Sequence, residues 1–215
     1  MKHSEWLKTG ISKTFKQRRF DTIDKLCHYQ LSHPTRKIKV LDVGCAEGKD
    51  ILSFIPKNPN IELYGLDIKE YDMINKDVNF IIGDASNMDY PDDFFDIIVS
   101  VGTLEHVQPI EKLCDAIKEI NRVSKEFYIM VPAITTPYEP HAHQFFWGLR
   151  RHRKHHPWLM FFDDLTWLKF EGFSHAFVTR FWYIPGFISN LIIYKNTEAT
   201  KKATVEYKLW QKKKY

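Results

Sequence analysis

The chain has 215 residues, of which 44% are hydrophobic, and a formal net charge of +4; these values fit one globular domain with a sizeable core. No stretch approaches the roughly 20 apolar residues of a membrane span, and the first residues lack the apolar segment of a signal peptide. Cys27, Cys45 and Cys114 are widely spaced without a C-x-x-C pair. This pattern argues against a disulfide framework or thiolate zinc site and predicts a reducing, cytoplasmic compartment.

Residues 12–31 are predicted to form an amphipathic helix, because Phe20, Ile23 and Leu26 recur at helical spacing and Pro34 follows the segment. Such a helix either caps a binding site or covers a sheet.

The segment KIKVLDVGCAEGKD, residues 37–50, predicts a buried strand, a turn containing Gly44 and Gly48, and then a helix. That order is typical of the cofactor-binding corner of an α/β sheet. Ala46 and Lys49 occupy two glycine positions of a dinucleotide fingerprint, which excludes that motif. Only three residues separate the glycines, which excludes a P-loop.

The LDVGCAEG part of this segment resembles the first motif of the class I S-adenosyl-L-methionine (SAM)-dependent methyltransferases. The resemblance implies SAM as cofactor. It also implies a Rossmann-like α/β fold, with a seven-stranded, mostly parallel sheet, helices on both faces and an antiparallel last strand. It assigns cofactor contacts to Asp42, Gly44, Cys45, Ala46 and Gly48. An ordinary tight turn is the alternative, and Cys45 is most simply a small packing residue.

Residues 61–67 predict a second strand that ends at Asp67, 19 residues after Gly48. A carboxylate at this strand end can accept hydrogen bonds from both ribose hydroxyls of a nucleoside, although an Asp here could also cap a helix. Ile68, the next residue, is included in the predicted cofactor site.

Residues 78–82 predict a third strand, which Asp84 and Ala85 follow closely. In the family that the chain resembles, the acid at this point receives the adenine amino group and the next backbone N–H serves a ring nitrogen. The resemblance implies these roles for Asp84 and Ala85, whereas Asp84 as a plain turn residue is the alternative.

Residues 94–100 predict a fourth strand that leads into VGTLEHV, a segment similar to one in the family's small-molecule branch. The resemblance spans residues 37 to about 132 and adds Val101, Gly102 and Leu104 to the expected cofactor site. His106 is the candidate general base, because histidine titrates near working pH. Glu105 either orients it or satisfies backbone N–H groups, and a structural role for His106 stays open.

No metal site is predicted. One quinone-biosynthesis branch of the family carries a metal-binding Glu where this chain has Gly102, and the clustered histidines between 141 and 156 lack clear carboxylate or thiolate partners.

The rest of the sheet is predicted from apolar periodicity and turn residues. We expect a helix over 109–124, a fifth strand over 127–131, a short helix over 163–170, and antiparallel strands over 174–183 and 187–194.

The acceptor side is expected in the insertion 133–162, which roofs the acceptor pocket in this fold. PYEPH, within residues 132–147, resembles a segment of some glycan-modifying methyltransferases. This resemblance implies that Tyr138, Glu139 and His141 face the acceptor. His143 and Trp147 are added to the expected acceptor site because histidine and tryptophan edges suit a carbohydrate or another polar acceptor. A solvated basic loop is the alternative.

We expect one methyltransferase domain, 1–215, with a helical cap (1–34), the insertion 133–162 and a basic tail (196–215). Residues 143–162 and the Lys-rich tail could contact an anionic surface.

The expected reaction is O-methylation of a sugar, a glycan or another small hydroxyl acceptor. Segments typical of nucleobase amine methylation are missing. Methylation of a cytosine carbon needs a cysteine nucleophile near the end of the fourth strand, but Cys114, the one cysteine after that strand, falls inside a predicted helix. An RNA or lipid-linked acceptor, or a non-catalytic SAM-binding scaffold, remain the alternatives.

Overall fold

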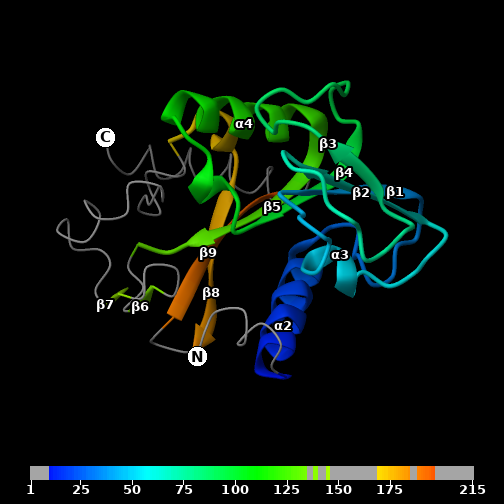
Figure 1. Ribbon diagram of the computed structural model, residues 1–215, viewed down its shortest axis with the longest axis horizontal. Helices are drawn as coiled ribbons and strands as arrows, with labels where there is room; N and C mark the ends of the chain where they lie inside the picture. Colours follow the sequence, from blue (N-terminus) through cyan, green and yellow to red (C-terminus); the bar gives the residue numbers. More distant parts are fainter. Residues whose placement is uncertain (1–9, 135–137, 140–143, 146–168, 185–187, 197–215) are drawn as a thin grey trace, which may run out of the picture.

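The computed structural model of the protein describes residues 10–134, 138–139, 144–145, 169–184 and 188–196. Its main strands are β1 (Ile38–Val43), β2 (Ile61–Asp67), β3 (Asn79–Ile82), β4 (Phe95–Val101), β5 (Ser124–Pro132), β8 (Phe177–Ile184) and β9 (Ile188–Lys195). They form a seven-stranded sheet in the order β3-β2-β1-β4-β5-β9-β8 (Figure 1). The first five strands pair in parallel, and β9 runs antiparallel to both β5 and β8. The predicted fold class is confirmed.

Helices cover both faces of this sheet. The α-helices are α2 (Gly10–Leu26), α3 (Ile51–Phe54) and α4 (Ile110–Val123), and two 3₁₀ turns are η1 (Leu104–His106) and η2 (Glu171–Phe173). Figure 1 shows α4 above the sheet and α2 with α3 below it. The predicted helix 109–124 is therefore confirmed within a residue at each end.

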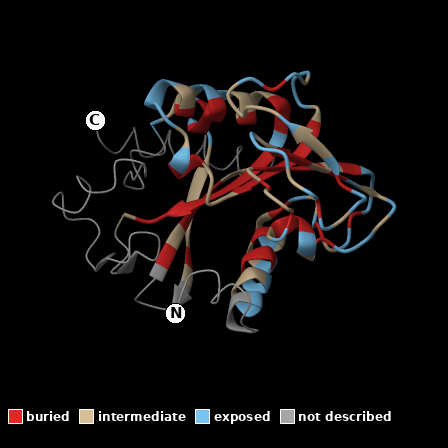
Figure 2. Cartoon of the chain, viewed as in Figure 1, coloured by how far each residue is buried: buried red, intermediate tan, exposed pale blue. Residues whose placement is uncertain are grey.

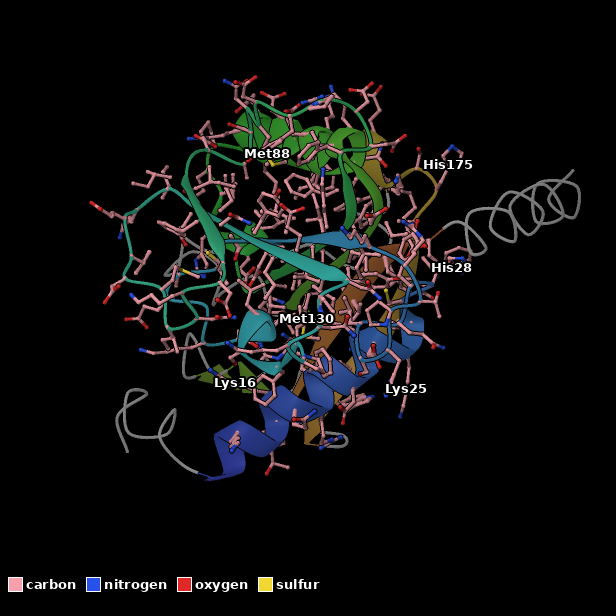
Figure 3. All side chains as sticks on the ribbon, turned by 90° about the vertical axis from the view of Figure 1, so that its right-hand side faces the viewer. Lys16, Lys25, His28, Met88, Met130 and His175 are labelled. Atoms are coloured by element: carbon pink, nitrogen blue, oxygen red, sulfur yellow. The ribbon has the colours of Figure 1, made fainter. Side chains whose placement is uncertain are left out.

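The two layers of core follow from the alternation of side chains along each strand. In β4, Ile98 belongs to the core beneath α4, whereas its neighbours Ile97 and Val99 pack with the α2 residues Phe20 and Ile23. Buried residues fill the sheet and the inner faces of the helices (Figure 2). In Figure 3, Met88 lies beside α4 and Met130 lies on the opposite side of the sheet.

The N-terminal helix ends earlier than its sequence predicts. The prediction was 12–31, but α2 ends at Leu26. The Leu26 carbonyl accepts hydrogen bonds from Tyr128 Oη (3.1 Å) and Asn196 Nδ2 (3.0 Å), and the His28 amide donates to Glu126 Oε2 (3.2 Å). These bonds to β5 and to the end of β9 replace the next turn of the helix.

The last two strands were predicted correctly, but η2 was not. Strand β8 begins at Phe177 rather than at 174, because η2 occupies the preceding residues. Gly172 allows η2 to approach α4, since a Cβ at this position would lie 2.7 Å from the Ile117 carbonyl oxygen. The predicted short helix 163–170 falls almost wholly outside the described residues.

Candidate active site

The turn between β1 and α3 has a backbone that few side chains tolerate. Gly44, Ala46 and Gly48 have φ values of +77°, +45° and +74°, in the left-handed region. The Gly44 and Cys45 amides both donate to the Leu66 carbonyl, at 2.8 and 3.2 Å, which fixes the turn against the end of β2. The predicted glycine turn therefore lies beside the predicted acid at the end of β2.

Asp67, at the end of β2, is held by backbone amides on both sides. Its Oδ2 accepts a hydrogen bond from the Ala46 amide (3.0 Å), and its Oδ1 accepts one from the Lys69 amide (3.1 Å). Each carboxylate oxygen has a further lone pair, so the group can still accept hydrogen bonds from a ligand.

Asp84 follows β3 and is paired with a cation from another element. Its Oδ1 accepts bonds from the Ser86 amide (3.0 Å) and hydroxyl (2.8 Å), and its Oδ2 lies 2.5 Å from Lys112 Nζ on α4. Burial opposes ionisation of this carboxyl, but the Lys112 and Ser86 contacts outweigh it and lower the pKa of Asp84. Asp84 is thus an ionised acceptor at neutral pH.

A cavity of about 280 Å³ collects residues from the ends of four strands. Six of the predicted site residues line it: Gly44, Asp67, Ile68, Asp84, Ala85 and His106. The remaining lining comes from Val43, Leu66, Gly83, Thr103, Val107, Gln108 and Lys112. The geometry therefore brings the four predicted segments to one pocket at the carboxyl edge of the sheet, where ligands bind in open α/β sheets.

Thr103, Gln108 and Lys112 are pocket residues that the sequence analysis missed. Thr103 lies inside the VGTLEHV segment, between the predicted cofactor residues Gly102 and Leu104, so its position in that segment could have identified it. No local pattern identifies Lys112, because its ion pair with Asp84 joins α4 to the loop after β3.

Other predicted cofactor residues lie around the cavity without lining it. Asp42 is only 3% exposed, and burial, followed by the neighbouring Asp50 charge, raises its pKa well above the usual value. Cys45 is buried, and burial together with Asp42 and Asp67 raises the pKa of its thiol to about 12. A thiol in this state is a poor nucleophile, which agrees with a packing role.

The loop after β4 contributes the remaining predicted contacts. Gly102 has a φ of +68°, and its amide donates to the Met130 carbonyl at 3.0 Å. Val101 is half-buried at the end of β4, and Leu104 is fully buried. Neither lines the cavity, nor do Gly102, Ala46 and Gly48.

Glu105 and His106 are adjacent in sequence but lie in different environments. Both belong to η1, yet Glu105 is 0% exposed whereas His106 is exposed and lines the cavity. A Cβ at Gly102 would lie 3.7 Å from Glu105 Oε1, so the carboxylate packs against the loop that carries it.

On the acceptor side, Tyr138 and Glu139 form the short strand β6, which pairs with β7 (Gln144–Phe145). Their side chains, and the whole of His141, His143 and Trp147, lie outside the part of the molecule that the structure describes.

Comparison with known proteins gives the family. Residues 34–146, more than half of the chain, match the family described as "Methyltransferase domain". The chain belongs to this methyltransferase family.

Curated relatives of the methyltransferase domain act on different acceptors. Ajmaline N-methyltransferase of Rauvolfia serpentina is 33% identical over 96 residues, 40% of this chain and 32% of the relative. The tRNA (carboxymethyluridine(34)-5-O)-methyltransferase of Arabidopsis thaliana is 29% identical over 120 residues, 54% of this chain and 28% of the relative. The chain spans about a third of the length of these relatives.

Solved structures share the fold of the methyltransferase domain. A 1,6-didemethyltoxoflavin-N1-methyltransferase from Burkholderia thailandensis, solved with S-adenosylhomocysteine, has a TM-score of 0.57 at 16% identity. The alignment covers 88% of this chain and 79% of that one. A putative methyltransferase solved with the Haloferax volcanii Trm112 activator has a TM-score of 0.54 at 17% identity, with 88% and 95% covered.

Two kinds of feature are absent from the described residues of the methyltransferase domain. Within the described residues, no group of three or more His, Cys, Asp or Glu side chains could hold a metal ion. No helix in the same residues is long and apolar enough to cross a bilayer.

Proposed function

We propose that the protein is a SAM-dependent methyltransferase that methylates a hydroxyl group of a sugar, a glycan or another small acceptor. The observation that carries the proposal is the cavity that joins Gly44, Asp67 and Asp84 to His106. Gly44, Asp67 and Asp84 are the residue types that hold a nucleoside cofactor. His106 adds a titratable imidazole to the same cavity.

The residues around the cavity suit SAM. Asp67 retains lone pairs for the ribose hydroxyls, and Asp84 with the Ala85 amide suits the adenine edge. Gly44 and Gly48 carry no side chain where the backbone must approach the ligand. Asp42 is a buried carboxylate beside this turn, which suits the ammonium group of the cofactor.

The proposed role of His106 is to take the proton of the acceptor hydroxyl as the new C–O bond forms. Its ring is exposed at the cavity, so an acceptor can reach it. SAM supplies a methyl group activated by the sulfonium charge. Glu105, buried in the same 3₁₀ turn, is proposed to fix the loop that presents His106. The segment 133–162, with Tyr138, Glu139, His141, His143 and Trp147, is proposed to complete the acceptor site.

The test measures methyl transfer from radiolabelled SAM to a panel of sugars, glycans and small phenols, with RNA as a separate arm. Transfer to a hydroxyl acceptor that a His106→Ala variant loses supports the proposal. SAM binding without transfer to any acceptor class would indicate a binding scaffold, and absence of SAM binding would reject the enzyme itself.

A nucleic-acid acceptor is the second candidate, because one relative is a tRNA methyltransferase. Binding through several phosphates releases counterions, so RNA methylation should fall steeply as salt rises. A neutral sugar should show little dependence. Salt-sensitive transfer to RNA with none to glycans would favour this second candidate.

A further inference from the structure

An ion pair joins Asp84, in the loop after β3, to Lys112, in the first turn of α4. The Lys112 Nζ atom lies 2.5 Å from Asp84 Oδ2, and both residues line the cavity. Helix α4 lies above the sheet in Figure 1, so the pair connects this helix to the edge of the sheet. The two side chains are 37% and 35% exposed, and an ion pair this exposed contributes little to stability. Stability alone therefore gives little reason for the pair.

The place of Lys112 within α4 is unfavourable for a lysine. It is the third residue of the helix, and the partial positive charge at a helix N-terminus favours acidic side chains there. Glu111, the residue before it, follows that preference. The carboxylate of Asp84 compensates for the position of Lys112, because it brings an opposite charge to within contact distance of the ammonium group.

The contacts of Asp84 leave one place on its carboxylate for a ligand. A carboxylate has about four lone-pair sites, two on each oxygen. The Ser86 amide (3.0 Å) and hydroxyl (2.8 Å) fill both sites of Oδ1, and Lys112 fills one site of Oδ2. Because Ser86 fixes one oxygen and Lys112 fixes the other, the remaining lone pair of Oδ2 has a defined direction.

The main chain sets the position of Asp84 relative to Asp67. Strands β2 and β3 pair in parallel with Asp67 opposite Ile82, and the Gly83 amide donates to the Asp67 carbonyl at 2.9 Å. These bonds determine where a ligand that reaches both acids must lie. The direction of the Asp84 carboxylate depends in addition on Lys112.

We propose that Lys112 is a positioning residue that directs the remaining lone pair of Asp84 at the exocyclic amino group of the adenine base, which makes the site selective for a 6-aminopurine cofactor. The proposal rests on the proposed assignment of Asp84 to the adenine edge and adds the residue that orients this acid. An N–H donor on the base completes the hydrogen bonds of the carboxylate. A purine without this donor leaves one lone pair of a partly buried carboxylate unfilled, which costs affinity.

The experiment measures, by calorimetry, how much the amino group contributes to binding. The ligands are S-adenosylhomocysteine and its analogue with hydrogen in place of the 6-amino group, and the readout is the ratio of their dissociation constants. We expect the unaltered protein to bind the analogue about ten-fold more weakly or worse. Lys112→Met should reduce this ratio several-fold, with most of the loss falling on S-adenosylhomocysteine. Lys112→Arg keeps a cation and should retain a larger ratio than Lys112→Met.

Two control variants of α4 separate positioning from structural support. A second contact joins α4 to the loop after β3, because the Met88 amide donates to Glu119 Oε2 at 2.9 Å. Neither residue lines the cavity, so Glu119→Gln alters a connection between the same two elements and should leave the ratio unchanged. Lys118→Met removes another lysine of the helix, which pairs with Glu171 outside the cavity, and should also leave the ratio unchanged.

An Asp84→Ala variant tests whether the lysine acts through this carboxylate. It should bring the ratio close to one, and adding Lys112→Met should then change the ratio no further. Circular dichroism and thermal unfolding first establish that each variant is folded. Lys112→Ala, with a residue that suits a helix, takes the place of Lys112→Met if the latter does not fold.

Three results would overturn the proposal and leave cofactor binding intact. The first is an unchanged ratio in Lys112→Met, or an equal fall in either control, which would make the lysine a structural support. The second is tighter binding of S-adenosylhomocysteine by Lys112→Met, which would show that the lysine competes with the base for Asp84. The third is a ratio near one in the unaltered protein, which would show that Asp84 does not receive the amino group. If the unaltered protein binds neither ligand, the proposed function fails as well.

Discussion

Thr103 lies directly over Gly44, so closely that a Cβ on Gly44 would be 2.1 Å from the Thr103 hydroxyl oxygen. The two residues come from different strand ends, after β1 and after β4, and both line the cavity. Position 44 therefore requires a glycine for two reasons: its φ is +77°, and Thr103 leaves no room for a Cβ.

Gly44→Ala should weaken SAM binding by at least ten-fold, because the added methyl group must displace Thr103. The left-handed backbone conformation costs an alanine about 1–2 kcal/mol more. Calorimetry measures the affinity. Adding Thr103→Ala should restore part of the loss by removing the clash while the backbone strain remains. No recovery in the folded double variant would show that Thr103 is not the obstacle.

Asp67→Ala should weaken SAM binding by roughly 10- to 150-fold, since a lost hydrogen bond to a charged acceptor costs about 1.5–3 kcal/mol. The Ala46 amide also loses its acceptor, so thermal unfolding must be measured alongside affinity. Asp77→Ala serves as the control. Unchanged affinity in a folded Asp67→Ala variant would exclude the ribose assignment.

His106→Ala should lower turnover by roughly 10²–10⁴ with little change in SAM affinity, because a general base acts on the acceptor and not on the cofactor. Turnover is measured with the acceptor found in the transfer assay. If turnover stays near normal, the imidazole is structural and the base must be sought around Glu139 and His141.

Asp96 should support stability against acid. It is buried at the start of β4 and accepts hydrogen bonds from Lys125 Nζ (2.9 Å), the Lys39 amide (3.0 Å) and Arg36 Nη2 (3.1 Å). Burial alone would raise its pKa, but these three donors outweigh that effect and lower it.

Because the pKa of folded Asp96 is below its unfolded value, its contribution is present above about pH 4 and is lost as pH falls through the folded pKa. Asp96→Asn should lower the free energy of unfolding by about 1–3 kcal/mol at pH 7 and flatten its decline in acid. Urea unfolding across pH 3–7 measures both effects. An unaltered acid slope would contradict the assigned role.

The sequence by itself determined the succession of the strands along the chain, the β1 turn and the acids that follow β2 and β3. Those features are local: apolar periodicity, glycines where φ is positive and polar residues at strand ends specify them without reference to distant segments. The antiparallel strands β8 and β9 were predictable for the same reason, since Pro185 and Gly186 lie between two apolar runs.

The tertiary structure alone decided which side chains meet. It ended α2 at Leu26 through bonds from Tyr128 and Asn196, and it paired Asp84 with Lys112. It also buried Glu105 while leaving its neighbour His106 at the cavity. Each of these outcomes depends on hydrogen bonds or packing between residues far apart in the chain, and no local periodicity encodes such contacts.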